Sequence, residues 1–258
     1  MSTGATDLKA AARIALACLD LTSLNDADTP ADIEALCQRA RSAHGDVAAV
    51  CVWPRFVAQA RAALPAHIKV AAVADFPDGA LDLKRALADV EAIASAGGDE
   101  VDVVLPWRAL LADEAGDEVA DFLSAVREAS EPLTLKVIIE SGELKKPERI
   151  AQATRLALAA GADFVKTSTG KTAVGATPEA AAVMLKEIAT SGLSSAGFKA
   201  SGGVRSVLDA AGYIAQAEAA LGADALVPQR LRFGASGLLT DIEAVLSGAA
   251  STASTAAY

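Results

Sequence analysis

The chain has 258 residues with a formal net charge of −10, and 52% of its residues are hydrophobic. That apolar content supplies a sizeable core and excludes both wholesale disorder and a fibrous repeat. The acidic excess excludes a dedicated nucleic-acid binder, which needs a basic surface against phosphates.

The cysteines and the N-terminus set expectations about the compartment. Cys18, Cys37 and Cys51 have spacings that match neither a disulfide framework nor a zinc knuckle, so we expect free thiols in a reducing compartment. The first twenty residues include Asp7 and lack the apolar region of a signal peptide, and no run of about 18 uncharged apolar residues occurs. We therefore expect a cytoplasmic protein that does not bind a membrane.

Short apolar runs alternate with alanine-rich segments along the chain. The runs predict strands, and the charges at three-to-four spacing in the alanine-rich segments predict amphipathic helices. In chain order, the expected strands are residues 14–19, runs beginning at Val47, Ile68, Asp99, Leu133, Ala162 and Gly197, and residues 232–235. The expected helices are residues 30–43, 81–96, 117–129, 148–160, 178–190 and 206–221. Three helix starts are marked by Thr29 with Pro30, Thr177 with Pro178, and Ser206.

A glycine shortly followed by aspartate precedes four of the apolar stretches, beginning at Gly45, Gly97, Gly161 and Gly222. Glycine suits the left-handed conformation through which a chain leaves a helix. About eight strand-and-helix units at this length predict a single-domain (β/α)8 TIM barrel over residues 1–248, with a flexible tail over residues 249–258. The alternative is an open doubly wound sheet, which the lack of an N-terminal Gly-x-Gly-x-x-Gly motif disfavours.

Two lysines, Lys166 and Lys199, end consecutive apolar runs, at the strand ends where a barrel places its active site. A free lysine is almost wholly protonated at neutral pH and cannot attack a carbonyl. A second ammonium about 5 Å away lowers its pKa by about 2 units at an effective dielectric near 20, and burial acts in the same direction. The pair predicts a Schiff-base enzyme, with Asp102 of an earlier run handling protons.

Polar residues at strand ends also have simpler interpretations. A lysine there can be a solvated rim charge, which is how we interpret Lys84, Lys145, Lys146 and Lys186. Lys136 lies inside its run on the same face as Glu140, and we expect it to be a supporting interior charge. Asp102 would then serve only as the partner of such a lysine. Cys18 and Cys37 are interpreted as core or helix residues, and Cys51 has the same alternative.

Three small-residue loops follow the sixth, seventh and eighth runs, at Gly170-Lys171, Gly202-Gly203 and residues 234–237. Barrel enzymes often bind phosphate at these positions with backbone N–H groups, and Lys171 or Arg205 would add charge. Only two histidines, His44 and His67, occur, which leaves little material for histidine catalysis or a histidine-rich metal site. We expect a small phosphorylated substrate and neither a metal nor an organic cofactor.

The sequence resembles the deoxyribose-phosphate aldolase family of class I aldolases. The similarity covers nearly the whole chain, in LDLTSLND, VCVWPRF, DEVDVVLPWRAL, LKVIIESGEL, ADFVKTSTGK, GFKASGGVR, RFGASGLL and a terminal tyrosine. The resemblance implies reversible cleavage of 2-deoxy-D-ribose 5-phosphate to acetaldehyde and D-glyceraldehyde 3-phosphate without a cofactor.

The resemblance also implies roles for individual residues. Lys166 would form the Schiff base, Lys199 would perturb it and relay protons together with Asp102, and Tyr258 would move the proton on the aldehyde-derived carbon. Asp20 and Cys51 would line the pocket near the substrate hydroxyls. The phosphate would be held by Gly170, Lys171, Gly202, Gly203, Val204, Gly234 and Ser236. Two departures from some members are Ala200-Ser201 in place of Pro-Ala and Gly237 in place of a second serine, which removes one hydroxyl on the phosphate side.

Two other functions fit the same residues. One is another phosphosugar barrel enzyme, an isomerase or a transaldolase-like enzyme, and the other is a catalytically silent sugar-phosphate sensor. A borohydride-dependent adduct on one lysine distinguishes the aldolase from the sensor. The expected partners are small phosphorylated sugars and aldehydes, with no nucleic acid and no membrane, and the family leads us to expect a homodimer.

Overall fold

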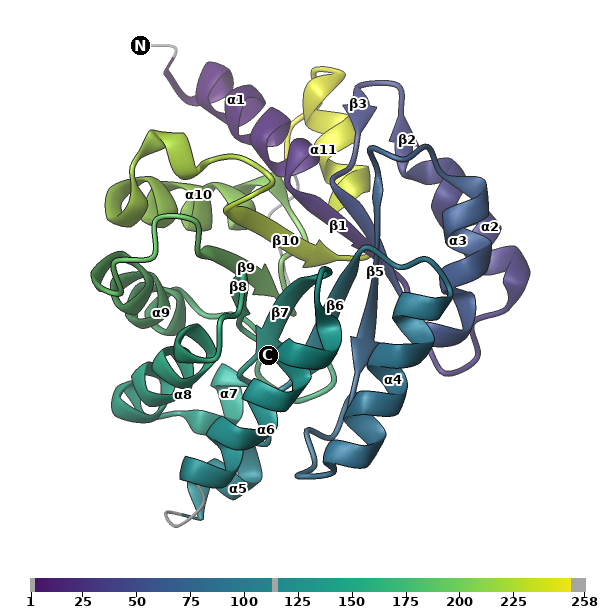
Figure 1. Ribbon diagram of the computed structural model, residues 1–258. Coiled ribbons are helices and arrows are strands. Elements are labelled where there is room, and N and C mark those ends of the chain that lie inside the picture. The colour runs from purple at the N-terminus through teal and green to yellow at the C-terminus, as the bar shows by residue number, and fades with distance from the viewer. Residues whose placement is uncertain (1–2, 113–115, 252–258) are drawn as a thin grey trace.

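Eight parallel strands close into a barrel surrounded by helices (Figure 1), which confirms the predicted fold class. The computed structural model describes residues 3–112 and 116–251. The barrel order is β1-β10-β9-β8-β7-β6-β5-β4. Its strands are β1 (Leu19–Thr22), β4 (Ala49–Val52), β5 (Lys69–Ala74), β6 (Glu100–Val104), β7 (Thr134–Ile138), β8 (Phe164–Lys166), β9 (Gly197–Ser201) and β10 (Leu231–Ala235). Two short strands, β2 (Arg41–Ser42) and β3 (Gly45–Asp46), form a separate antiparallel hairpin.

All the predicted helices are present, and additional ones occur between them, but the helix predicted over residues 30–43 ends at Arg39, and Arg41–Ser42 form β2. The larger helices are α1 (Thr3–Ala17), α2 (Pro30–Arg39), α3 (Val57–Ala63), α4 (Leu83–Ser95), α6 (Gly116–Ser130), α8 (Pro147–Ala159), α9 (Pro178–Thr190), α10 (Val207–Leu221) and α11 (Leu238–Leu246). Short ones are α5 (Trp107–Leu111), α7 (Ser141–Leu144) and the 3-10 turns η1 (Pro54–Phe56) and η2 (Ala223–Ala225). The three predicted helix starts are confirmed, because Thr29, Thr177 and Ser206 each accept a hydrogen bond from a first-turn N–H.

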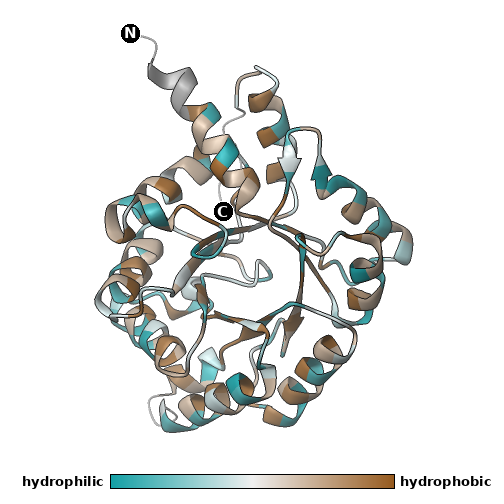
Figure 2. Cartoon of the chain, turned by 45° about the horizontal axis from the view of Figure 1, so that its top comes forward, coloured by the Kyte–Doolittle hydropathy of each residue, from teal (hydrophilic) through white to brown (hydrophobic). Residues whose placement is uncertain are grey.

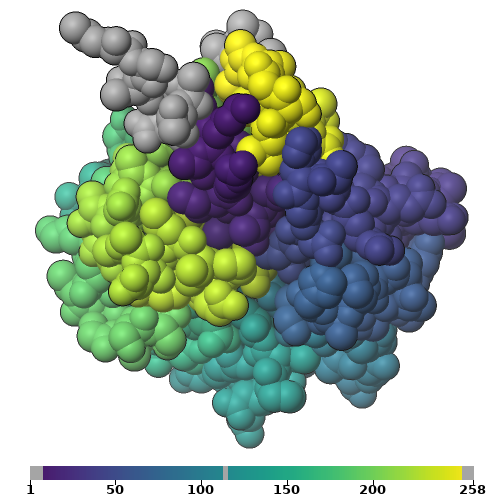
Figure 3. Space-filling view, turned by 90° about the horizontal axis from the view of Figure 1, so that it is seen from above, coloured from purple at the N-terminus to yellow at the C-terminus, as the bar shows by residue number. Residues whose placement is uncertain are grey.

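The predicted strand over residues 14–19 is wrong. Ile14 lies in α1, which continues to Ala17, and β1 begins only at Leu19. The alanines before Ile14 favour a helix, and the apolar residues there fit both periods, so the run could not be assigned from its pattern. Figure 3 shows this N-terminal helix lying against α11 and α10 on the outside of the barrel, and both helices contact it.

Buried apolar residues of the strands and of the surrounding helices form one hydrophobic core. Figure 2 shows hydrophobic residues along the barrel strands and the surrounding helices. Because successive side chains of a strand point to opposite faces, each strand sends one set of residues outward to the helices and the other into the barrel. In β6, Val101 and Val103 join the hydrophobic core, whereas Glu100 and Asp102 contact charged side chains from other strands. The barrel interior therefore holds a polar cluster inside an apolar shell.

Two copies of the glycine-and-aspartate repeat, residues 97–99 and 161–163, have the same structural basis. Asp99 accepts hydrogen bonds from the Val70 N–H at 2.9 Å and from Arg61 at 2.7 Å. Asp163 does the same one unit further on, with the Leu135 N–H at 2.8 Å and Arg127 at 3.0 Å. Each aspartate thus ties its own strand to the preceding strand and helix, which explains why the pattern recurs.

Residues 249–251 follow α11 and lie beyond residue 248, where the predicted domain ends. Ser251 Oγ donates a hydrogen bond of 2.6 Å to the buried carboxylate of Asp241 in α11. Tyr258 and its six predecessors lie outside the described residues, so the flexible tail stays a prediction. Within the described ranges, none of the helices has the length and apolarity needed to cross a membrane.

Candidate active site

Lys166 and Lys199 lie side by side on neighbouring strands and point into the barrel. They are register partners in the β8–β9 pairing, and both donate to the same atom, Asp102 Oδ2, at 2.8 and 2.7 Å respectively. Lys199 also donates to Asp20 Oδ2. All four side chains are buried. The two amines that the sequence singled out therefore share one carboxylate oxygen.

A second tier of charges lies behind this group. Lys136 Nζ lies 2.5 Å from Glu100 Oε2, 2.8 Å from Asp102 Oδ1 and 3.4 Å from Asp20 Oδ2. Arg232 donates to Asp20 at 2.6 Å and to Glu100 at 2.8 Å. Lys136 is thus the interior charge expected from its place in the run, whereas nothing in the sequence singled out Glu100 or Arg232.

The charge balance of this cluster indicates which of its lysines loses a proton most readily. The cluster contains four basic and three acidic side chains, and a net charge in a protein interior is costly. Lys199 and Arg232 each contact two carboxylates and Lys136 contacts three, whereas Lys166 contacts Asp102 alone among the residues described. Loss of a proton from Lys166 is therefore the least costly way to neutralise the cluster.

The pKa shifts follow the same logic. Burial is the largest influence on Lys166 and lowers its pKa; Asp102 opposes this and Lys199 adds to it, so the pKa lies below the ordinary lysine value. Burial also acts to lower the pKa of Lys199, but Asp102 and Asp20 outweigh it and raise that pKa above its usual value. Burial thus contributes more than the repulsion between amines that the sequence argument emphasised.

The carboxylates of the cluster stay ionised for a related reason. Burial alone would raise the pKa of Asp102, but the surrounding lysines, led by Lys136, hold it well below its usual range. Asp20 is lowered in the same way, mainly by Lys199 and Arg232. Burial raises the pKa of the Cys51 thiol, and Asp102 adds to the effect. At neutral pH Asp20 and Asp102 are therefore carboxylates and the Cys51 thiol is neutral.

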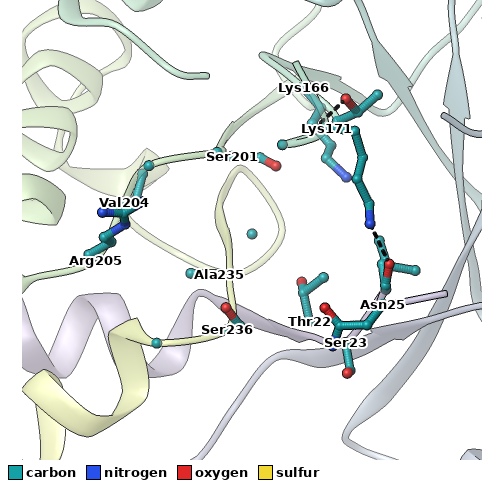
Figure 4. A pocket seen from close by; sticks show the side chains of 17 residues that line it. Thr22, Ser23, Asn25, Lys166, Lys171, Ser201, Val204, Arg205, Ala235 and Ser236 are labelled. Carbon is teal, nitrogen blue, oxygen red and sulfur yellow. Dashed lines mark hydrogen bonds between the residues drawn. The ribbon is translucent and has the colours of Figure 1, made fainter. Parts of the chain in front are cut away.

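A pocket of about 290 Å³ opens above Lys166 at the carboxyl ends of the strands. Four loops form it, after β1, β8, β9 and β10, and Figure 4 shows their side chains around the cavity. Lys166 is the cluster member that lines this pocket. The pocket thus gives a small ligand access to the amine with the lowered pKa, and leaves its charged partners in the interior.

The structure gathers all the predicted phosphate residues in this pocket. Its lining includes Gly170, Lys171, Gly202, Gly203, Val204, Gly234 and Ser236, and also Arg205 and Gly237. Asp20 and Cys51, which the resemblance placed near the substrate hydroxyls, are instead fully buried and do not line it. Their roles as substrate contacts stay predictions.

Glycines allow the loops after β8 and β9 to approach each other closely. Gly202 has φ +84, and a Cβ there would lie 3.0 Å from Gly175 Cα and 3.4 Å from Gly170 Cα. Gly170 itself has φ +76, a conformation that disfavours residues with a side chain. Both loops consequently line the same small cavity.

The loop after β1 forms a wall of the pocket that sequence reasoning missed. Thr22, Ser23, Leu24 and Asn25 line it, and Lys171 Nζ donates a 2.8 Å hydrogen bond to the Leu24 carbonyl. The LDLTSLND motif contains these residues, but only Asp20 of this motif was singled out from the sequence. The signal was present in the sequence, because polar residues directly following a strand belong to the same barrel face.

The fold and the pocket together define a TIM-barrel protein with a buried lysine at the floor of a pocket bordered by glycine-rich loops. The chain belongs to the DeoC/LacD family of aldolases, whose family model matches residues 14–243. It is 48% identical over 243 residues to a protein of Agrobacterium fabrum named deoxyribose-phosphate aldolase, and the match covers 92% of each chain.

Solved structures agree with this assignment. A crystal structure from Toxoplasma gondii ME49, described provisionally as a deoxyribose-phosphate aldolase, has a TM-score of 0.85 at 25% identity and covers 95% of this chain and 97% of its own. The deoxyribose phosphate aldolase of Aeropyrum pernix, described as a tetramer, has a TM-score of 0.72 at 23% identity and covers 95% and 99%. The second match is a likeness of fold alone.

Proposed function

We propose that this protein is a Schiff-base aldolase that reversibly cleaves 2-deoxy-D-ribose 5-phosphate to acetaldehyde and D-glyceraldehyde 3-phosphate. The observation that carries the proposal is the position of Lys166, which lies buried beside Lys199 and Asp102 at the floor of a pocket bordered by loops rich in glycine, where burial lowers its pKa. The similarity to the Agrobacterium protein supports this substrate.

The reaction begins with attack of the neutral Lys166 amine on the open-chain aldehyde carbon, C1 of the sugar. The resulting carbinolamine loses water to give an iminium ion. Removal of the proton from the C3 hydroxyl then breaks the C2–C3 bond, and its electron pair passes into the iminium. This step releases glyceraldehyde 3-phosphate and leaves an enamine. Protonation at C2 and hydrolysis release acetaldehyde and restore the amine.

Lys199 and Asp102 have complementary parts in the proton transfers. The raised pKa of Lys199 keeps its ammonium available as an acid when the carbinolamine loses water. The lowered pKa of Asp102 keeps it a carboxylate that holds both amines in place and accepts protons through water. We propose Tyr258 for proton transfer at C2 on the basis of the family resemblance, and that residue lies outside the described part of the chain.

The phosphate end of the substrate would lie against the loops after β8, β9 and β10. Helix α11 begins at Leu238, directly after Gly237, which lines the pocket, so the N-terminus of this helix lies beside the pocket. Backbone N–H groups at a helix start favour an anion. Lys171 and Arg205 add positive charge at the same pocket. A homodimer and a cytoplasmic location stay predictions. Light scattering tests the homodimer by measuring the molar mass in solution.

The test is turnover of 2-deoxy-D-ribose 5-phosphate, with acetaldehyde and glyceraldehyde 3-phosphate measured separately by coupled dehydrogenases. We expect equal amounts of the two aldehydes from the wild type and none from Lys166→Met. Release of neither aldehyde by the wild type would contradict the proposal. Isomerisation without cleavage would indicate the alternative phosphosugar enzyme.

A further inference from the structure

Glu140 is a fully buried carboxylate two residues beyond the end of β7, and it has no part in the proposed chemistry. It directly precedes α7 and has φ +52, a left-handed conformation that costs energy for a residue with a Cβ. It does not line the pocket. Both its burial and its backbone conformation are unfavourable, so a compensating role for its side chain is expected.

The carboxylate binds the loop that follows β8. Oε2 accepts hydrogen bonds from Thr169 Oγ1 at 2.5 Å and from the Thr169 N–H at 3.2 Å. Oε1 lies 3.2 Å from Thr172 Oγ1, which donates to it. Burial raises the pKa of Glu140, and the hydrogen bonds from Thr169 and Thr172 oppose that rise. Both carboxylate oxygens therefore serve as acceptors for one short segment of the chain.

The contacts of Glu140 continue through this loop to the far wall of the pocket. Thr169 Oγ1 accepts a 3.0 Å hydrogen bond from the Lys171 N–H, and Lys171 Nζ in turn donates to Leu24 O at 2.8 Å. The N–H groups of Thr169 and Lys171 are thus used within this network. In the described part of the chain the Gly170 N–H has no hydrogen-bond partner. The network leaves that donor for a ligand.

We propose that Glu140 is a positioning residue that confers the preference for phosphorylated over non-phosphorylated substrates, by holding Thr169–Gly170–Lys171 in the geometry that binds phosphate. The substrate part of this inference rests on the proposed function. Glu140 acts through the loop, and in the described structure it forms neither a hydrogen bond nor an ion pair with Lys166, whose charge only weakly lowers the pKa of Glu140. Its absence should therefore weaken phosphate binding far more than it alters the chemistry at Lys166.

Glu140→Gln tests this with little change in size, because the amide replaces one acceptor oxygen by a donor that faces Thr169 or Thr172. We expect KM for 2-deoxy-D-ribose 5-phosphate to rise about tenfold, the effect of one lost charge-assisted hydrogen bond, with kcat nearly unchanged. Activity on 2-deoxy-D-ribose should stay within about twofold of wild type. The matched control is Glu148→Gln, at an exposed position in the first turn of α8.

Two further measurements keep the outcomes distinct. Glu140→Asp keeps the charge but shortens the reach to Thr169, and we expect the same selective loss, which also covers the case that Glu140→Gln does not fold. Calorimetric titration with inorganic phosphate measures the site without turnover, and both variants should bind it about tenfold more weakly than wild type.

Three results would overturn the inference. Equal losses on the phosphorylated and free sugars would show a general structural role, and unchanged kinetics with both would show no role. Tighter phosphate binding by Glu140→Gln would show that the carboxylate acts by repelling the anion. If the wild type cleaves neither sugar, the proposed function fails, and the phosphate titration still decides the role of Glu140.

Discussion

Replacement of Lys199 by methionine should shift the pH dependence of Schiff-base formation. The variant removes the ammonium that shares Asp102 Oδ2 with Lys166 and leaves the shape of the side chain nearly intact. At a separation of about 5 Å and an effective dielectric near 20, the lost repulsion is about 3 kcal/mol. That energy corresponds to about 2 pKa units. Asp102 also becomes less compensated, which raises the pKa of Lys166 further.

The readout is the rate at which cyanoborohydride traps acetaldehyde on the protein, followed by intact mass as a function of pH. The rate should rise with pH as Lys166 loses its proton, and the midpoint of that rise should move about 2 units upward in Lys199→Met. The test uses the pH of the midpoint and not the maximal trapping rate. Lys199 is also the proposed acid for loss of water, so its replacement lowers the maximal rate whatever the pKa of Lys166.

A midpoint that stays at its wild-type pH would refute the claim that Lys199 helps to lower the pKa of Lys166. Lys199→Arg keeps the positive charge and should keep the wild-type midpoint. Lys186→Met removes an exposed lysine of α9 and should change neither midpoint nor rate.

Two predictions concern stability. Burial raises the pKa of Asp75 to about 7, because in the described structure neither carboxylate oxygen has a hydrogen-bond partner and the Arg85 guanidinium, 3.8 Å away, opposes the rise only in part. Because the pKa of Asp75 is higher in the folded than in the unfolded state, the carboxylate destabilises the fold increasingly as pH rises from about 4 to about 7. Asp75→Asn should therefore raise the free energy of unfolding by about 1–3 kcal/mol at pH 8 and by much less at pH 5. An equal effect at both pH values would contradict this prediction. Lys136→Met removes the buried ammonium that contacts Glu100, Asp102 and Asp20, and should lower that free energy by about 3–5 kcal/mol in urea titrations. An unchanged urea midpoint would show that Lys199, Arg232 and Lys166 compensate the three carboxylates without it.

The sequence contained most of the information about the barrel, because its strands and helices differ in length and in hydrophobic period. Helix α9 matches the predicted bounds of 178–190, where a capping threonine and a proline mark its start. The run before Leu19 could not be resolved in this way, since its alanines and apolar residues are compatible with both structures. Helices such as α7, with only four residues, are too short for any periodic signal.

The site was predictable in part. Lys166 and Lys199 could be singled out because charged residues at the ends of apolar runs are costly without a purpose. The identity of the less basic lysine depends on which carboxylates each one meets, and that depends on contacts between distant strands. Arg232, for example, contacts Glu100 at a separation of 132 residues along the chain. No local pattern reveals such a pairing.

The most direct test of the account is to reduce the wild-type protein with borohydride in the presence of acetaldehyde and to locate the adduct by peptide mapping. We expect one reduced ethyl group per chain, on Lys166, and no adduct on Lys136 or Lys199. An adduct on either of those lysines, or none at all, would contradict it.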